Sequence, residues 1–457
     1  MEETLLSYLR DKLPFAMLLG ALTGCVTTTG SNASGCSPGG LNENQKAPGD
    51  QPGGVQVGMG DIAVAPSGDF VVFKRGTELA VGWPATGAVE ILPVTAPTRL
   101  AFSRTRPVVY VGSEVDSSVH AIDVETREEL WRAPIFDASG ATLRIAATAD
   151  DARVVLSTWD QVVLLDAGAG DELASLSAGS VVVDLEILPD DARALIVPEH
   201  TWVDGAATTR ITVLDLHEGA THDFDVPNCS DNIVIPRDGA RAFLAPTTCT
   251  ADPISIIDLA PGAEQFVRNL PGFGPLALGP DGVTAVGFLD GNNVDATLFE
   301  HPEQIPTSDE TNTYFLMVLD TEDLSYNFYP AGLELPRYAI TPNGSVLLVD
   351  TAFGSPVRLF DIESGTFRAV AGPPILLHDF VLTSDSVHAY ALYGELYDLN
   401  IELAKTAEIP TGFTPLNINI APDDRTLYLR ESETKVCVFS LDTRKCGSYL
   451  TTEPPAL

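Results

Sequence analysis

A unit of about forty residues recurs nine times between Asp61 and Leu450, and this repetition constrains the fold more than any other feature of the chain. Each copy contains two strand-like segments joined by a turn of the Pro-Asp-Gly kind. Successive copies lie 38 to 47 residues apart, with one longer gap of 62 residues. The first residue of the turn marks the register at Pro66, Arg104, Ala149, Pro189, Pro236, Pro280, Pro342, Ser384 and Pro422.

Each copy also has a characteristic residue at the expected end of its third strand, and in seven of nine copies it is Asp. These residues are Trp83, Asp123, Asp166, Asp215, Asp258, Asp320, Asp361, Asp398 and Ser440. Four positions later come Gly87, Arg127, Gly170, Gly219, Gly262, Leu324, Gly365, Glu402 and Arg444. A short carboxylate at a strand end accepts backbone N–H groups of the following turn. Because the aspartates recur once per copy, we predict turn capping and not one shared metal or catalytic site.

The repeat predicts an all-β fold, a single β-propeller of four-stranded blades that spans residues 61–457. Before the turn markers, apolar residues alternate with small or polar ones, as in Ile62 and Val64 or Leu100 and Phe102. Such alternation indicates strands with a buried face. Nine sequence copies predict nine blades, whereas a degenerate terminal copy that completes another blade would give eight.

The N-terminal segment carries a second signal. Residues 13–24 (LPFAMLLGALTG) are apolar but too few to cross a bilayer. The run ends in Leu22-Thr23-Gly24-Cys25, which resembles the lipobox of bacterial lipoproteins. The resemblance implies a signal peptide over 1–24, diacylglycerol on the Cys25 thiol, and, since Val26 follows, sorting to the outer membrane on its periplasmic or surface side. Residues 25–60 are rich in Gly, Ser, Asn and Pro, which predicts a flexible tether.

The chain has six cysteines, of which Cys25 is assigned to lipid. Cys437 and Cys446 flank the last turn between strands three and four, where Cβ atoms across a hairpin come close enough to be bridged. Cys229 and Cys249 flank the fifth hairpin between strands one and two. Export to an oxidising compartment makes both pairs candidate disulfides, with unlinked thiols as the alternative. No C-x-x-C motif occurs, which disfavours zinc ribbons, haem c attachment and thioredoxin chemistry.

Charge and motifs argue against several functions. The 63 acidic residues outnumber 26 Lys and Arg, and the resulting net charge of −37 would repel the phosphates of a nucleic acid. The seven His residues are scattered, and the chain contains no Gly-x-Ser-x-Gly elbow, phosphate-binding Gly loop or His-Glu-x-x-His motif. We therefore assign no catalytic residue, no metal site and no cofactor, although propellers can assemble enzymatic sites from different blades.

Two copies are expanded between their second and third strands, the fourth at about 199–209 and the sixth at about 290–313. In a propeller these loops share a face with the blade-to-blade connections, and extra loops on one face of a repeat array often form its binding surface. Neutral drift in a tolerant loop is the alternative. The binding candidates in the sixth-copy loop are Asp290, Asn292, Asn293, Asp295, Glu300, His301 and Glu303.

The repeat units resemble the YVTN and lactonase-like propeller repeats over nearly all of residues 61–457. The clearest unit combines Ile340-Thr341-Pro342-Asn343-Gly344 with Val357 to Asp361 and Ser364-Gly365. The segment from Ile122 to Trp131 looks like the tryptophan-docking repeat of quinoprotein propellers and of the propeller lipoprotein in outer-membrane barrel assembly. The other copies lack that Trp. The resemblance implies the fold and leaves the function open, since the superfamily contains surface proteins, lactonases and cofactor-binding enzymes.

These patterns predict a monomeric, lipid-anchored cell-envelope propeller that binds or scaffolds an envelope protein or an extracellular ligand without catalysis. The alternative is a lactonase-like hydrolase or isomerase with a site at the central channel. Clustered His, Glu, Asp or Arg side chains at one mouth of the channel would favour the enzyme. A channel lined by small and apolar side chains would favour the scaffold.

Overall fold

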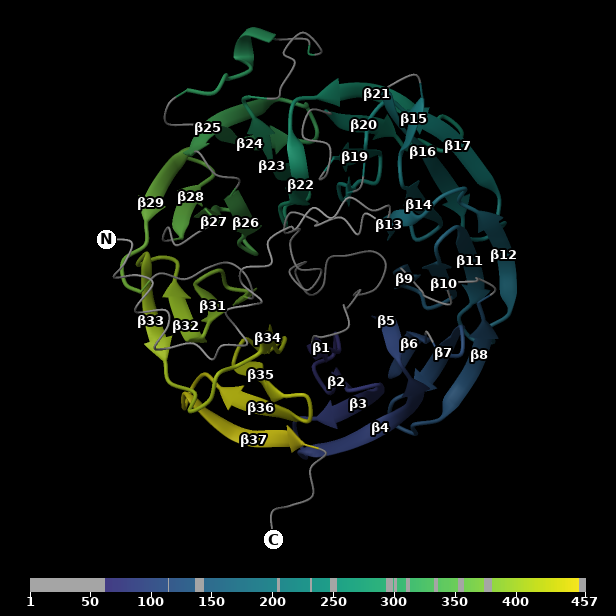
Figure 1. The fold of residues 1–457 in the computed structure, drawn as a ribbon, viewed down its shortest axis with the longest axis vertical. Helices are drawn as coiled ribbons and strands as arrows, with labels where there is room; N and C mark the ends of the chain where they lie inside the picture. Colours follow the sequence, from purple (N-terminus) through teal and green to yellow (C-terminus); the bar gives the residue numbers. More distant parts are fainter. Residues whose placement is uncertain are drawn as a thin grey trace, which may run out of the picture. The chain divides into compact units, whose positions relative to one another are not determined.

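A computed structural model describes residues 62–113, 115–135, 144–203, 206–230, 232–246, 253–292, 299, 302–309, 313–332, 336–351, 357–373 and 380–451. The chain divides into two units, Met1–Pro38 and Gly39–Leu457, and every described residue belongs to the second. Within that unit the described residues form nine antiparallel sheets, eight of four strands and one of five, around a common axis (Figure 1). The predicted all-β propeller is confirmed, with one sheet, called a blade here, for each sequence copy.

Each blade is a meander whose first strand lies nearest the axis and whose last strand lies at the rim (Figure 1). Blades 1 to 3 consist of β1 (Ile62–Val64), β2 (Val71–Arg75), β3 (Glu78–Trp83), β4 (Ala88–Thr95); β5 (Pro97–Phe102), β6 (Val108–Ser113), β7 (Ser118–Asp123), β8 (Glu129–Pro134); and β9 (Arg144–Ala147), β10 (Arg153–Ser157), β11 (Gln161–Asp166), β12 (Glu172–Ser177). Blade 4 consists of β13 (Val182–Ile187), β14 (Arg193–Pro198), β15 (Thr201–Val203), β16 (Ala206–Asp215) and β17 (Thr221–Val226).

The remaining blades repeat the same order. Blades 5 to 7 consist of β18 (Asn232–Val234), β19 (Arg241–Ala245), β20 (Ile254–Asp258), β21 (Gln265–Leu270); β22 (Phe273–Leu278), β23 (Thr284–Asp290), β24 (Tyr314–Asp320), β25 (Tyr326–Gly332); and β26 (Pro336–Ile340), β27 (Val346–Thr351), β28 (Arg358–Asp361), β29 (Thr366–Ala369). Blades 8 and 9 consist of β30 (Phe380–Leu382), β31 (His388–Tyr393), β32 (Glu395–Asn400), β33 (Lys405–Ile409); and β34 (Asn417–Ile420), β35 (Thr426–Ser432), β36 (Lys435–Ser440), β37 (Lys445–Thr451).

Within the described part of the chain, the only helical element is a single 3-10 turn, η3 (Pro302–Gln304). None of the described segments forms a helix with the length and hydropathy needed to cross a bilayer.

The hydrophobic core lies between neighbouring blades. One buried cluster joins Phe70, Val72 and Leu79 of blade 1 to Phe102 and Val109 of blade 2. Central strands are therefore covered on both sides, and all six residues of β6 are buried. The rim strand β8, which has one exposed side, shows alternating burial instead over most of its length. Alternation of buried and exposed side chains with a period of two is therefore found mainly in the strands at the rim.

In the described part of the chain, the ring closes between blade 9 and blade 1 without exchange of a strand, since each blade is built from consecutive strands. The side chain of Asn417 accepts the backbone N–H of Ile62 at 3.3 Å, and that of Asn419 donates to the Ile62 carbonyl at 2.9 Å. The guanidinium of Arg430 donates to the carbonyl of Lys74 at 2.8 Å. A shared apolar cluster adds Leu450 of the last strand to the blade 1 side chains.

The predicted disulfide between Cys437 and Cys446 is confirmed, with a Cα–Cα distance of 5.7 Å. The two residues are not directly opposite in the hairpin: Cys446 pairs with Phe439, and Cys437 pairs with Tyr449. A register shift between Val438 and Phe439 separates the two pairs. Cys229 is also disulfide-bonded. Its predicted partner, Cys249, lies outside the described residues, as does Cys25, so both assignments stay predictions.

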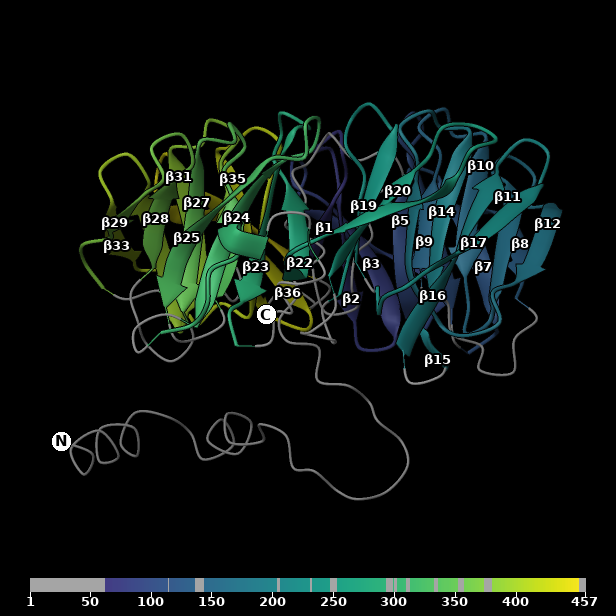
Figure 2. The same cartoon turned by 90° about the horizontal axis from the view of Figure 1, so that it is seen from above.

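The ends of the strands form two faces of the ring, seen at the upper and lower edges in Figure 2. One, the capping face, carries the turns between strands one and two and between strands three and four. The other, the connection face, carries the turns between strands two and three and the blade-to-blade connections. The first residue of β1, Ile62, lies at the connection face, because strand one of every blade begins there.

Candidate functional site on the connection face

Turns between strands one and two link each blade of the capping face to the blade before it. In blades 3, 4 and 9 the third residue of the turn is an Asp with φ of 55° or 56°. Its carboxylate accepts the N–H of the first turn residue of the preceding blade, in the pairs Asp151–Arg104 at 3.1 Å, Asp191–Ala149 at 2.8 Å and Asp424–Ser384 at 2.9 Å. These aspartates therefore satisfy backbone donors across a blade boundary.

Proline changes this contact because it has no N–H group. The residue at positive φ that follows a turn beginning with Pro is Gly68, Gly239 or Gly344, and in blade 8 it is Ser386. In blade 5 this residue is the fourth counted from Pro236, so the turn lies one residue later than the sequence register, and Gly282 of blade 6 faces Arg237 instead of a proline. A Cβ atom on the glycine would lie 3.1 to 3.4 Å from the proline ring in the pairs Gly68–Pro422, Gly239–Pro189 and Gly344–Pro280. In blade 2 the third residue, Arg106, does not have a positive φ, so this turn departs from the pattern.

Turns between strands three and four are capped as the sequence predicts. The carboxylate of Asp166 accepts the N–H groups of Gly168 and Ala169, both at 2.9 Å. Asp123, Asp215 and Asp320 each accept two N–H groups of their own turns in the same way. A residue at positive φ follows four positions after the strand end. The repeated aspartates are thus structural and do not converge on one site.

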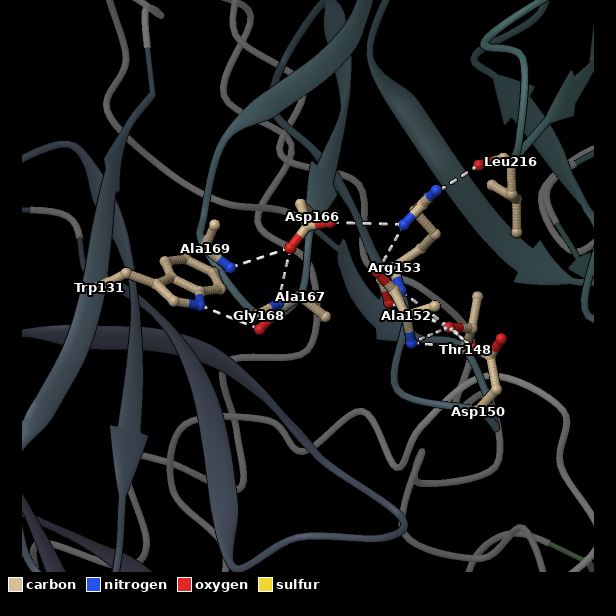
Figure 3. A network of polar contacts seen from close by, with 10 residues as sticks. All are labelled: Trp131, Thr148, Asp150, Ala152, Arg153, Asp166, Ala167, Gly168, Ala169 and Leu216. Atoms are coloured by element: carbon tan, nitrogen blue, oxygen red, sulfur yellow. Dashed lines mark hydrogen bonds and ion pairs between the residues drawn. The ribbon is translucent and has the colours of Figure 1, made fainter.

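Side chains from one blade also dock on these turns in the next (Figure 3). The indole Nε1 of Trp131 in β8 donates to the carbonyl of Ala167 in blade 3 at 3.0 Å. Its ring covers Gly170, where an added Cβ would lie 2.6 Å from an indole carbon. From the start of β10, Arg153 donates to the carbonyl of Leu216 in blade 4 at 3.2 Å. The single docking Trp is therefore an inter-blade contact.

The eighth copy corrects the predicted register. Strand β32 continues two residues past Asp398 to Asn400, whose side chain accepts the N–H of Leu403 at 2.8 Å. The positive φ falls on Ala404 and not on Glu402. Asp398 is instead buried, where it contacts His388 Nδ1 at 2.7 Å and Arg444 at 3.4 Å. Asn accepts the same hydrogen bonds as Asp, so it replaced the expected Asp as the cap.

The connection face carries both predicted insertions. In blade 4 the insertion is a short hairpin in which β15 pairs with an extension of β16, from Thr201 opposite Thr208 to Val203 opposite Ala206. The hairpin lies at the lower edge of the ring in Figure 2. In blade 6 the described part of the insertion includes η3, and Ile305 beside it is buried against Leu289 and Phe315. This second insertion therefore packs on strands β23 and β24 of its own blade through a small apolar cluster.

The candidate residues of the sixth-copy loop are only partly described. Asp290 is the buried last residue of β23 and accepts the N–H of Asn292 at 2.9 Å. The Asn292 side chain, which is exposed, accepts the hydroxyl of Ser308 at 2.5 Å. Glu303 is exposed in η3. Asn293, Asp295, Glu300 and His301 lie outside the described residues, so a binding role for this loop stays a prediction.

Exposed aromatic side chains are the feature that the sequence analysis missed. Among the described residues, the exposed aromatic side chains are Trp159, Trp202 and Tyr393, at 49, 65 and 51 % exposure. Each lies at or beside a turn between strands two and three, in blades 3, 4 and 8 respectively. Val115 and Leu416 are also exposed on this face. The repeat register gives the position of each turn between strands two and three. An aromatic residue at such a turn was therefore the signal in the sequence that could have identified these side chains.

The cavity beside Tyr393 is acidic and partly apolar. It has a volume of about 400 Å³ and is lined by Glu395, Glu408, Phe413 and the loop that leads from blade 8 to blade 9. The same two carboxylates act on the phenol of Tyr397. Burial raises the pKa of this phenol, and the negative charges of Glu408 and Glu395 raise it further. Positively charged groups of a ligand are therefore favoured here over anions.

A Ser-His-Glu arrangement exists in blade 2, but it is closed to substrates. The Ser118 hydroxyl lies 2.9 Å from His120 Nε2, and His120 Nδ1 lies 2.6 Å from Glu129. Ser118 is only 1 % exposed, and its hydroxyl also contacts Asp116 and Arg132. A nucleophile must reach the reacting carbon, so this cluster is a structural network. No group of three or more His, Cys, Asp or Glu side chains in the described ranges could hold a metal ion.

Comparisons with known proteins support the fold alone. No protein-family model and no curated protein matches the chain. A crystal structure of the eukaryotic initiation factor is similar with a TM-score of 0.51 and 14 % identity, over 74 % of this chain and 83 % of that one. Dihydro-heme d1 dehydrogenase NirN gives 0.49 and 13 %, over 77 % and 74 %. Hydrazine synthase of Kuenenia stuttgartiensis gives 0.41 and 14 %, over 79 % and 96 %. Identities this low leave the function undetermined.

Proposed function

We propose that the protein is a lipid-anchored β-propeller of the bacterial outer membrane that acts as a non-enzymatic binding or scaffold protein through its connection face. The observation that carries the proposal is the difference between the two faces. Turns of the capping face are occupied by contacts between blades, as in Asp191 on Ala149 and Trp131 on Ala167. The connection face holds both insertions and the three exposed aromatic side chains of the described residues.

Among the described residues, a catalytic set would need an accessible nucleophile. The one nucleophile–base–acid arrangement that we find there has a buried serine. Rigid scaffolds with variable loops on one face are typical of proteins that bind through those loops. The anchor itself follows from the lipobox ending in Cys25, with residues 25–60 as the tether.

Site-specific photo-cross-linking in intact cells tests the use of the connection face. A photoreactive residue at Asp160 or Thr201, which are exposed on that face, should form adducts with envelope components. Matched positions on the capping face, Glu125 and Glu218, should form few or none. Adducts confined to the capping-face positions would contradict the proposal.

The anchor has its own test. Cys25→Ser removes the thiol that the lipobox assigns to diacylglycerol, so the protein should leave the membrane fraction and stop incorporating labelled fatty acid. Cys36→Ser, another cysteine substitution within residues 25–60, is the matched control and should remain with the membranes. Equal membrane association of the two variants would rule out lipidation at Cys25.

A further inference from the structure

The exposed aromatic side chains are distributed around one face of the ring. Trp159 and Trp202 belong to blades 3 and 4, and Tyr393 belongs to blade 8 of nine. Blades 4 and 8 lie on opposite sides of the ring axis (Figure 1). A small ligand or one short peptide cannot contact both positions at once. A flat, extended surface that lies across the face is large enough to reach all three.

The chemistry of these side chains limits the kinds of surface that the connection face can bind. Trp and Tyr combine an apolar ring with one polar atom, and both are enriched at the boundary between lipid and water. Two ion pairs lie in the neighbouring blades 2 to 4, with Asp116 2.8 Å from Arg132 and Arg144 3.9 Å from Asp184, whereas Asp160 beside Trp159 is an exposed carboxylate. Charges in such pairs lose less hydration than single charges do when a face meets lipid head groups.

The opposite face could not meet such a surface in the same way. Its turns carry a high density of carboxylates, among them Asp150, Asp190, Asp323, Asp385 and Asp423. Docking of the connection face therefore directs much of the acidic surface away from the membrane. The start of the propeller agrees with this orientation, since Ile62 begins β1 at the connection face and the tether precedes it.

We propose that the connection face docks on a lipid surface, with Trp159, Trp202 and Tyr393 as anchors at the lipid–water boundary. The cavity beside Tyr393, with Glu395 and Glu408 in its wall, favours head groups that carry an ammonium over purely anionic ones. The inference rests on the proposed envelope function and names the surface that covers this face. Lipid at Cys25 would hold the propeller at a high effective concentration near the bilayer, so a weak docking surface suffices.

Vesicle flotation of the propeller unit, residues 39–457, tests this inference. This unit holds all described contacts within itself, and it lacks both the lipid and the apolar residues 13–24. Vesicles of phosphatidylcholine and phosphatidylethanolamine should carry the protein to the top of the gradient and shift its Trp emission to shorter wavelength. Vesicles of phosphatidylglycerol should bind it at least about tenfold more weakly at low salt, because the chain has a net charge of −37.

The decisive variant is the triple substitution Trp159→Ser, Trp202→Ser and Tyr393→Ser. It should weaken binding to the zwitterionic vesicles about tenfold or more and abolish the emission shift. The matched control changes three exposed apolar residues away from the connection face, Leu130→Ser, Leu173→Ser and Leu403→Ser, and should bind within about twofold of the parent. Circular dichroism should show the same fold in both, because all six side chains are exposed.

A second variant tests the head-group preference. Glu395→Gln with Glu408→Gln should reduce the preference for zwitterionic vesicles, whereas Glu125→Gln with Glu172→Gln, which changes the net charge equally, should not.

Failure of this inference is distinguishable from failure of the proposed function. If the parent does not float, or if the aromatic triple variant floats as well as the parent, lipid docking is wrong. Cross-links from Asp160 or Thr201 to an envelope protein would in that case still support binding by the connection face. Cross-links to lipid from those positions, together with flotation, support both.

Discussion

Trp131 contacts the next blade through two separable interactions, ring packing on Gly170 and a hydrogen bond to the carbonyl of Ala167. Trp131→Phe keeps an aromatic ring and loses the bond, which should cost about 1 kcal/mol of unfolding free energy. Trp131→Ala also removes the packing of a buried side chain and should cost about 3 kcal/mol. Chemical denaturation of the three proteins measures both steps. Equal losses for Phe and Ala would show that ring packing contributes nothing.

Asp385 links stability to pH at the capping face. The hydroxyl of Thr383 and then the N–H of Val387 hold its pKa below the ordinary value of 3.8. A lowered pKa in the folded state means that the carboxylate stabilises the fold above about pH 3.8 and loses this effect as the pH falls through the folded-state pKa. Asp385→Asn removes this pH-dependent contribution.

Thermal unfolding of the Asp385→Asn variant should therefore differ from that of the parent at pH 7 and converge with it below pH 3.8. The difference at pH 7 should stay under about 1 kcal/mol, because Asp385 is exposed and water screens its charge. Asp69→Asn, at an exposed position in another turn, is a control for the change in net charge. A stability gap that does not narrow as the pH falls below 3.8 would contradict this account.

At the scale of the element, consecutive turns of the capping face are matched in sequence. An Asp follows a turn that begins with Arg104, Ala149 or Ser384, which offer an N–H group. Gly68, Gly239, Gly344 and Ser386 follow turns that begin with Pro, which offers none. Gly282 is an exception, because it lies against Arg237. The match is physical, because a carboxylate placed over a proline ring would have no donor from that residue.

This matching predicts a specific compensation between two blades. Ala149→Pro alone removes the N–H that Asp191 accepts, and Asp191→Gly alone leaves that N–H without its acceptor. Each should destabilise the fold by about 1 to 2 kcal/mol. The double variant recreates the Pro–Gly contact of Pro189 and Gly239 and should lose clearly less than the sum. Urea denaturation over the complete cycle measures the coupling, and additive losses would refute the matching rule.

The residue types in the turns explain why the sequence predicted most ends of the third strands correctly. Pro, Asp and Gly recur at fixed offsets because each satisfies a local backbone requirement, so eight of the nine predicted strand-three ends coincide with the observed ones. The eighth copy differed because Asn400 replaced the expected Asp as the cap while Asp398 took a buried role. Local turn geometry is readable from residue types, whereas a buried ion pair depends on neighbouring blades.

The candidate surface was harder to predict for the same reason. The repeat register places Trp159 in a turn, but its exposure depends on what surrounds that turn in the folded ring. Likewise, Ser118, His120 and Glu129 occupy adjoining strands, and only the packing around Ser118 shows that no substrate can reach it. Long-range burial is not encoded in local spacing, so the sequence predicted the faces but did not predict which aromatic side chains are exposed on them.

At the scale of the molecule, closure of the ring depends on the last blade. Chain ends that share one blade would be tied together by backbone hydrogen bonds, but the described strands of blade 9 all come from the C-terminal part of the chain. Side chains of Asn417, Asn419 and Arg430 make the polar contacts to blade 1 instead. Leu450 of β37 packs over Gly82, where an added Cβ would lie 2.8 Å from it. The rim strand of blade 9 therefore contributes directly to closure.

The disulfide between Cys437 and Cys446 ties this rim strand to β36 across a sequence separation of 9 residues. Cys437→Ser with Cys446→Ser should cost about 2.5 kcal/mol, the order expected when a loop of that size loses its cross-link. Serine substitution is preferable to a reductant, because Cys229 is also disulfide-bonded. Leu450 of β37 packs on blade 1, so loosening of β37 should also weaken the contact between blades 9 and 1. Amide exchange should therefore accelerate most in β37 and at the β1–β34 boundary, and far less in blades 3 and 4. Exchange that rises equally in all blades would show that the disulfide stabilises the fold as a whole and has no particular part in closing the ring.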